Sequence, residues 1–286
     1  MLQSSVRLAA SGIRIRPMER PLAKAISDRR FGIFAQQIEL AMGQNVIPLL
    51  TELRQPVDVA EIECLTASVS RGESAMLAAL IAQRRAEGQS SEHLCLTLLT
   101  LIARRLGEWW EEDHCTFVEV TLGTITLHQQ LRELAPSLVP AATIGGGRSA
   151  LMMTALGSQH SLGIAMVAAF FRAGGWAIVD DSMDSEAALI ARVAGQWFGL
   201  VAISVGSNDA LQPLAAQITA VRKYSRNPDV AIMLGGPALL AQPALAQAAG
   251  ADATAPDAAE ALRRAEALVA LMAPNPVPHP KPNPWR

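Results

Sequence analysis

The second half of the chain alternates short apolar runs with amphipathic helical segments, and this alternation limits the fold more than any other feature. Runs of this length are typical of buried strands, and the segments between them have helical periodicity. Strands so connected form a parallel sheet, because each right-handed crossover packs its helix back onto the sheet. The pattern predicts a doubly wound, five-stranded parallel sheet of the flavodoxin-like type. The predicted strand and helix pairs are Ala150–Ala155 with 161–174, Ala177–Val179 with 185–197, Leu200–Ser204 with 209–224, Val230–Leu234 with 238–248, and Asp252–Thr254 with 257–271.

A different pattern precedes this domain. Apolar residues recur at helical spacing, with Asp58 as a candidate cap and a helix start at Ser91 and Glu92, so we expect a helical-bundle cap. The predicted fold class is thus α/β plus all-α. The expected divisions are a basic leader and helix over 1–55, the cap over 56–140, a linker over 141–149, the Rossmann-like domain over 150–272, and a Pro-rich tail over 273–286.

Composition excludes several classes of protein. A net charge of −2 argues against a protein built mainly to grip nucleic acid. Three cysteines make no disulfide framework or zinc spacing, and no signal peptide or membrane-spanning segment is recognisable, so we expect a cytoplasmic protein without membrane contact. Residues 1–30 hold seven basic and two acidic residues. Direct DNA contact through this leader stays open, although no motif supports it.

Ligands of doubly wound sheets bind at the carboxyl ends of the strands. The loop after the first predicted strand reads Gly157-Ser158-Gln159-His160-Ser161-Leu162-Gly163, and it places one histidine between glycines just before a helix. A lone histidine is more often a surface or core residue than a metal ligand. The surrounding sequence therefore decides how His160 is interpreted.

This loop resembles the D-x-H-x-x-G signature of cobalamin-binding domains, with His160 and Gly163 in register. Ser204-Val205-Gly206 resembles the S-x-L element of that family, and Gly235-Gly236 resembles its paired glycines. The resemblance implies that His160 ligates cobalt from below while the nucleotide tail of cobalamin enters the sheet beside the next helix. The cofactor site that we predict, including the cap positions described next, comprises Trp109, Glu119, Val120, Gly157, Ser158, Gln159, His160, Ser161, Leu162, Gly163, Ser204, Val205, Gly206, Gly235, Gly236, Pro237 and Thr254, with His160 as the metal ligand.

The helical region is similar to the cap of cobalamin-dependent methyltransferase modules and light-sensing regulators. Trp109 and Glu119 match its W-x9-E-H pattern, in which the tryptophan shields the upper cobalt face and the glutamate lies near the corrin edge. Val120 replaces the histidine, and Ser158 replaces the aspartate that hydrogen-bonds the ligating histidine in methyl-transferring enzymes. Whether His114 or His128 faces the corrin is left open.

Taken together, these features most resemble the PpaA/AerR family of antirepressors. The resemblance implies a cobalamin-binding, light-responsive, non-enzymatic regulator that binds a transcriptional repressor of PpsR/CrtJ type and relieves repression of photosystem genes. The cofactor would be adenosyl-, methyl- or hydroxocobalamin. Two alternatives remain: a corrinoid methyl carrier of a methyltransferase system, and a heme-binding sensor on the same fold.

Overall fold

The computed structural model describes residues 58–138, 148–156, 161–180, 183–206, 213–241 and 244–272. The predicted leader helix, most of the predicted linker and the Pro-rich tail lie outside these ranges. Within the described ranges, no helix is long and apolar enough to cross a membrane.

The first described unit is helical, as predicted. Asp58 caps its first helix, because the carboxylate accepts a hydrogen bond from the Ala60 backbone N–H at 3.0 Å. The predicted helix start near Ser91 is also present, with Ser90 as the capping residue. The helices are α3 (Val59–Ser70), α4 (Ala75–Ala86), α5 (Ser91–Leu94), a π-helical turn η1 (Cys95–Leu99), α6 (Thr100–Glu111), α7 (Phe117–Leu134) and a 3-10 turn η2 (Ala135–Ser137).

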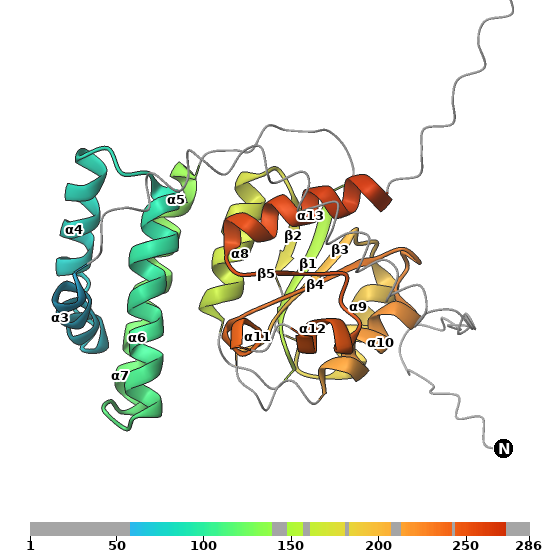
Figure 1. Cartoon of the computed structure of the whole chain (residues 1–286), viewed down its shortest axis with the longest axis horizontal. Coiled ribbons are helices and arrows are strands. Elements are labelled where there is room, and N and C mark those ends of the chain that lie inside the picture. The colour runs from blue at the N-terminus through green and yellow to red at the C-terminus, as the bar shows by residue number, and fades with distance from the viewer. Residues whose placement is uncertain are drawn as a thin grey trace, which may run out of the picture.

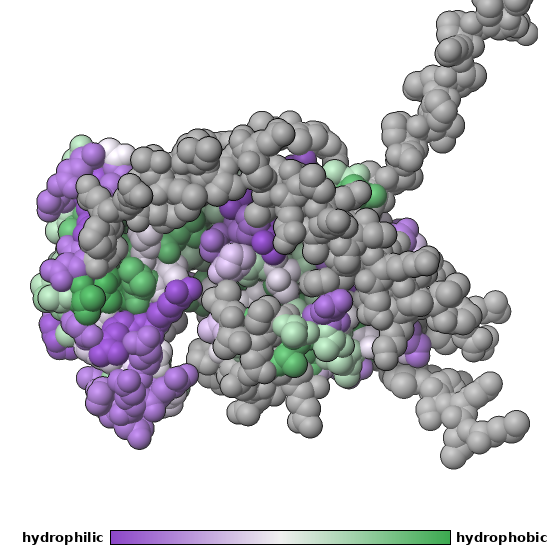
Figure 2. All heavy atoms as spheres, viewed as in Figure 1, coloured by the Kyte–Doolittle hydropathy of each residue, from purple (hydrophilic) through white to green (hydrophobic). Residues whose placement is uncertain are grey.

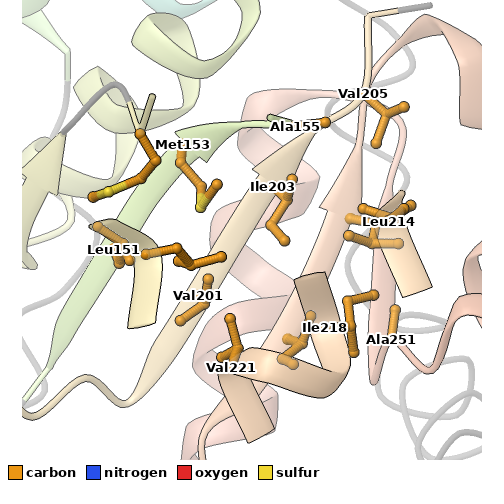
Figure 3. Close-up of a cluster of buried hydrophobic side chains, with 14 of the residues drawn as sticks. Leu151, Met153, Ala155, Val201, Ile203, Val205, Leu214, Ile218, Val221 and Ala251 are labelled. Atoms are coloured by element: carbon orange, nitrogen blue, oxygen red, sulfur yellow. The ribbon is translucent and has the colours of Figure 1, made fainter. Parts of the chain in front are cut away.

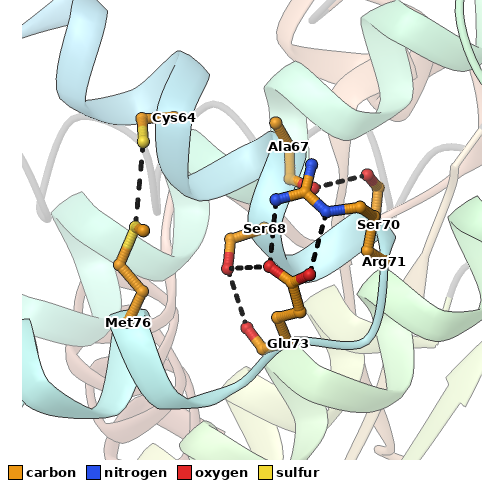
Figure 4. Close-up of polar contacts among 7 residues, drawn as sticks. All are labelled: Cys64, Ala67, Ser68, Ser70, Arg71, Glu73 and Met76. Atoms are coloured by element: carbon orange, nitrogen blue, oxygen red, sulfur yellow. Dashed lines mark hydrogen bonds and ion pairs between the residues drawn. The ribbon is translucent and has the colours of Figure 1, made fainter.

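Polar contacts fix the turn between α3 and α4 (Figure 4). The Ser68 hydroxyl donates to the Glu73 backbone carbonyl at 3.0 Å, and two Arg71 nitrogens donate to the Glu73 carboxylate. Gly72 has φ +77°, a backbone conformation that glycine adopts with little strain. The chain therefore reverses here within a few residues, and α4 returns along α3.

The second unit is the predicted five-stranded parallel sheet, in the order β2-β1-β3-β4-β5 (Figure 1). Helices α8 and α13 cover one face of the sheet, and α9, α10 and α12 lie on the other. The elements are β1 (Ser149–Thr154), α8 (Leu162–Ala173), β2 (Ala177–Asp180), α9 (Glu186–Gly195), β3 (Leu200–Ser204), α10 (Leu214–Tyr224), β4 (Ala231–Gly235), α11 (Pro237–Ala241), α12 (Ala244–Ala249), β5 (Ala253–Ala255) and α13 (Ala258–Met272).

Both faces of the central strands are buried, which explains their continuous apolar sequences. Leu151, Met153 and Val201 point into the core under α9 and α10 (Figure 3), whereas Ala150 and Met152 lie in the core under α8 and α13. Each strand thus supplies alternate side chains to two separate cores.

The predicted elements agree with the structure to within a few residues, with one correction. The single helix expected over 238–248 is two helices, α11 and α12. The sequence has Pro243 between them, and proline provides no backbone N–H for a continuous helix.

The helical unit and the α/β unit share apolar contacts. Met166, Ala169 and Phe170 of α8 belong to the same buried cluster as Leu127 and Leu131 of α7. Figure 1 shows α6 and α7 beside α8. The cap therefore lies against the helix that follows the predicted histidine loop.

Candidate functional site

The carboxyl edge of the sheet is held by backbone hydrogen bonds that continue past the strands. The Ala155 N–H donates to the Ser204 carbonyl at 2.9 Å, and the Val205 N–H donates to the Gly235 carbonyl at 2.8 Å. The ends of β1, β3 and β4 consequently lie side by side. These are the strands whose loops carry the predicted cofactor residues.

Gly163 and Ser204 meet between α8 and the sheet. A Cβ added to Gly163 would lie 3.6 Å from the Ser204 hydroxyl oxygen. The glycine in the first turn of α8 thus leaves the space before a hydroxyl at the end of β3 free of side-chain atoms. This arrangement fits the nucleotide tail of cobalamin, which needs a narrow path beside the helix and a hydrogen-bonding partner in it.

The paired glycines differ in their surroundings. Gly236 has φ +107°, and a Cβ there would lie 2.4 Å from the Val205 carbonyl oxygen. Only glycine fits so close an approach of two backbones. At Gly235 the nearest atom to an added Cβ is the Ala255 carbonyl oxygen, at 3.4 Å. Backbone packing therefore explains why residue 236 is a glycine, while a role of Gly236 toward the cofactor stays a prediction.

The remaining predicted residues of this edge lie in the strands or directly after them. Val205 is buried, Gly206 is half-buried, and Pro237 begins α11. Thr254 lies in β5 opposite Leu234, and its carbonyl accepts a hydrogen bond from Arg264. Thr254 is therefore two strands away from Ser204.

Residues 157–160, which include His160, lie outside the described ranges, so their predicted roles remain predictions. Both flanks of the loop are described. Leu156 follows β1, and its backbone N–H donates to the side-chain oxygen of Gln217 at 3.3 Å. Ser161 precedes α8, whose first residue, Leu162, packs against the core shared with the cap.

His128 of α7 contacts the far flank of this loop. Its Nε2 lies 3.2 Å from the Ser161 hydroxyl oxygen. Burial of the ring and the nearby Arg132 guanidinium lower the pKa of His128 below its ordinary value, and Asp180 acts in the opposite direction. The neutral form of the ring is thus favoured next to the residue that follows His160.

A pocket of about 690 Å³ lies beside this contact, between α7, η2, α8 and the end of β2. Its floor is apolar, formed by Leu131, Leu138 and Ile164 among others, and charged side chains lie at its rim. Arg172 and Asp180 at the rim are 3.7 Å apart. The pocket thus lies next to the C-terminal part of α7, where this helix packs against α8.

The α6–α7 hairpin extends past the end of α8 (Figure 1). Val120 is eight residues before His128 on α7, which corresponds to about 12 Å along the helix axis. Half-buried Trp109 lies in the last turn of α6 with the Arg105 guanidinium 5.9 Å from its ring. Trp109 and Val120 are therefore both near the protruding end of the hairpin.

Charged residues form the turn itself. Glu111, Glu112 and Asp113 are exposed, and Figure 2 shows this end of the molecule as hydrophilic. Behind the turn, the exposed rings of Trp110 and Phe117 pack edge to face with their centroids 6.4 Å apart. The hairpin thus offers aromatic surface along its sides and charge at its tip.

Glu119 has a partner within α7. Its carboxylate accepts hydrogen bonds from the Thr116 backbone N–H at 2.7 Å and from the Thr116 hydroxyl at 2.8 Å, which completes a capping box. These two hydrogen bonds lower the pKa of Glu119. The start of the helix thus supplies a hydrogen-bond partner for Glu119, and contact of this residue with the corrin edge stays a prediction.

Two residues at this site were not assigned from sequence. His128 was left open, because helical periodicity alone does not say which helix α7 packs against. Gln217 was missed, although its position gave a signal: it shares the sheet-facing side of its helix with Leu214, Ile218 and Val221. A polar residue in such an apolar row requires a hydrogen-bond partner.

The described part of the chain is a doubly wound α/β domain preceded by a helical cap. Residues 148–265 match the family model of the B12 binding domain. This match confirms the predicted cofactor, cobalamin, for this part of the chain. A search of curated proteins found no match.

One solved structure is similar in fold, and two others match with TM-scores below 0.5. The monomethylamine corrinoid protein of Methanosarcina barkeri is similar with a TM-score of 0.59 at 20% identity, over 71% of this chain and 96% of that one. A cobalamin-binding protein from Desulfitobacterium hafniense DCB-2 gives a TM-score of 0.39 at 15% identity, over 73% of this chain and 99% of that one. The methanol:cobalamin methyltransferase complex MtaBC from Methanosarcina barkeri gives 0.37 at 16% identity, over 81% and 92%.

Proposed function

We propose that His160 ligates the cobalt of cobalamin from below, that the nucleotide tail passes between Gly163 and Ser204, and that the α6–α7 hairpin covers the upper face. The observation that carries this proposal is the juxtaposition of Gly163 with the Ser204 hydroxyl. It lies beside the loop that contains His160, and a methyl group added at the glycine would come into van der Waals contact with the hydroxyl. When bound, an alkylcobalamin would supply a cobalt–carbon bond that light can break.

The hairpin supports the placement of the upper face. Val120 lies about 12 Å further along α7 than His128, and Trp109 lies in the last turn of α6, so both are at the protruding end of the hairpin, where we place the upper face of the cofactor. Trp109 provides an aromatic surface, and Val120 provides no ligand for cobalt. An organic upper group would consequently meet apolar and aromatic side chains.

We further propose that the protein is a light-responsive regulator acting on a repressor of PpsR/CrtJ type. Two residues support this role over methyl transfer. Ser158 cannot take up charge from the ligating imidazole as an aspartate can, and Val120 removes the upper-face histidine. A regulator of this kind works only through a difference in partner affinity between cofactor states, typically about 1–3 kcal/mol.

The second candidate is a corrinoid methyl carrier. The similarity in fold to the monomethylamine corrinoid protein favours it, because the similarity covers 71% of this chain and so extends beyond the α/β domain. A carrier would bind a methyltransferase in place of a repressor. The two roles therefore differ in the oxidation states that they require: the cobalt of a methyl carrier must be reduced to cobalt(I), and that of a sensor need not be.

Reconstitution tests the cofactor site. The purified chain is loaded in darkness with adenosyl-, methyl- or hydroxocobalamin, and its absorption is recorded before and after illumination. We expect a histidine-ligated spectrum that His160→Ala abolishes and that His114→Ala, at an exposed histidine paired with Glu112, leaves unchanged. An identical spectrum in the His160 variant would contradict the proposal, and a heme spectrum from cells would favour the heme alternative.

Partner binding tests the role. Affinity for a repressor of PpsR/CrtJ type is measured with dark holoprotein, illuminated holoprotein and apoprotein. A regulator gives different affinities in these states. Equal affinities, together with reduction to cobalt(I) and methylation by a partner methyltransferase, would identify a carrier.

A further inference from the structure

The hydrogen-bond ladder of β1 ends one residue before Leu156. Ala155 still donates to the Ser204 carbonyl of β3 at 2.9 Å, and the next N–H in the chain, that of Leu156, donates to the side-chain oxygen of Gln217 at 3.3 Å. Gln217 belongs to α10, 61 residues further along the chain. At the point where the chain leaves β1, a side-chain oxygen thus replaces a strand carbonyl as the hydrogen-bond acceptor of the backbone.

Gln217 is a polar residue in an otherwise apolar, buried row of α10. It is 2% exposed, on the side of α10 that packs onto the sheet between Leu214 and Ile218. Its Nε2 is buried and has no hydrogen-bond partner among the residues that the structure describes. A methionine or leucine would fill the same space without leaving a donor unpaired, so packing alone does not account for an amide here.

We propose that Gln217 is a positioning residue for the cobalt ligand: its side-chain oxygen fixes the direction of the chain four residues before His160. The inference rests on the proposed ligation of cobalt by His160. A ligand on a loop must be held within a narrow range of positions, and the groups that hold it tune metal affinity. Because Gln217 acts through the backbone of Leu156, it needs no contact with the cofactor.

The test compares matched buried glutamines. Gln217→Met removes the acceptor at similar volume, and Gln130→Met makes the same change at a glutamine of α7 that is also 2% exposed. Gln217→Glu keeps an oxygen for the Leu156 N–H. Each full-length variant is loaded with hydroxocobalamin, its far-UV circular dichroism is checked, and two quantities are recorded: the fraction with the histidine-ligated absorption spectrum and the rate of cobalamin release.

We expect Gln217→Met to lose the histidine-ligated fraction and to release cobalamin about 10-fold faster or more, as is typical when the support of a metal ligand is removed. Gln130→Met should keep the wild-type spectrum, and Gln217→Glu should lie closer to wild type than Gln217→Met. Wild-type spectra and release in both Gln217 variants would overturn the inference, as would equal changes in Gln130→Met. A wild-type protein with no His160-dependent spectrum would instead refute the proposed cofactor site.

Discussion

The Nε2 of His128 lies 3.2 Å from the Ser161 hydroxyl oxygen and so connects the cap to the residue that follows the predicted cobalt ligand. The partners are 33 residues apart, in α7 and before α8. Apolar side chains of α7 and α8 share a buried core next to this exposed contact. Movement of the cap and movement of the cofactor loop are therefore physically connected at this point.

This contact predicts a pH dependence. The pKa of His128 is lowered in the folded protein by burial and by Arg132. The unfolded chain consequently binds a proton that the folded protein does not, and the free energy of unfolding should fall as the pH drops below the ordinary histidine value of about 6.5. Thermal unfolding of apoprotein between pH 7.5 and 5.5 measures the effect. The His128→Gln variant should lose less stability at low pH than the wild type, and the His114→Gln variant should lose as much. An equal loss of stability in all three proteins would show that protonation of His128 is not its cause.

Gly163→Ala should separate stability from cofactor binding. The added Cβ has room, and alanine favours a helix over glycine by up to about 1 kcal/mol, so the apoprotein should gain stability. Cobalamin should bind about tenfold more weakly or worse, because the methyl group narrows the path of the nucleotide tail. Gly107→Ala, at a helical glycine of α6 with no neighbour within 4 Å, is the control for helix propensity. An unchanged affinity of Gly163→Ala for cobalamin would show that the nucleotide tail does not pass beside residue 163.

Gly236→Ala should damage the fold itself. Its Cβ would meet the Val205 carbonyl oxygen at 2.4 Å in a backbone conformation with φ +107°. We expect a loss of about 1–3 kcal/mol or more in urea unfolding of the apoprotein. Gly235→Ala, with its nearest contact at 3.4 Å, should lose less. A Gly236→Ala protein as stable as wild type would show that the two loops are not packed as described.

Trp109→Ala should discriminate among cobalamins. If the indole lies over the upper face, its removal weakens binding of adenosylcobalamin more than that of hydroxocobalamin, by about 0.5–1.5 kcal/mol for the lost aromatic contact. Titration followed by absorption gives both affinities. Trp197, which is 44% exposed just before β3, provides the control, since Trp197→Ala should change neither. An equal loss for both cofactors would argue against an upper-face position of Trp109.

Cys95 should report opening of the cap. It is fully buried, and burial raises the pKa of its thiol to about 12. Cys64 is exposed, so a thiol reagent should label Cys64 at once and Cys95 only after the cap opens or unfolds. Mass spectrometry of partly labelled protein distinguishes the sites. Labelling of Cys95 as fast as Cys64 in native protein would contradict the packing of the cap core.

Much of the fold was predictable because its signals are local. The alternation of apolar runs and helical segments gave all five strands to within one residue at each end, and Asp58 marked the start of the cap. The division of 238–248 into two helices was missed, since the apolar pattern continues across Pro243. The order of the loop motifs indicated a cobalamin-binding domain, and the B12 binding domain match over 148–265 agrees with that prediction.

Local sequence patterns specified the class of fold and the cofactor and predicted the loops that could reach it, because strand alternation and short motifs are properties of neighbouring residues. Only the tertiary structure decided which distant side chains support those loops. His128 reaches Ser161, and Gln217 reaches Leu156, because α7 packs on α8 and α10 packs on the sheet. No periodicity specifies such pairs, since they depend on how completed elements pack against one another.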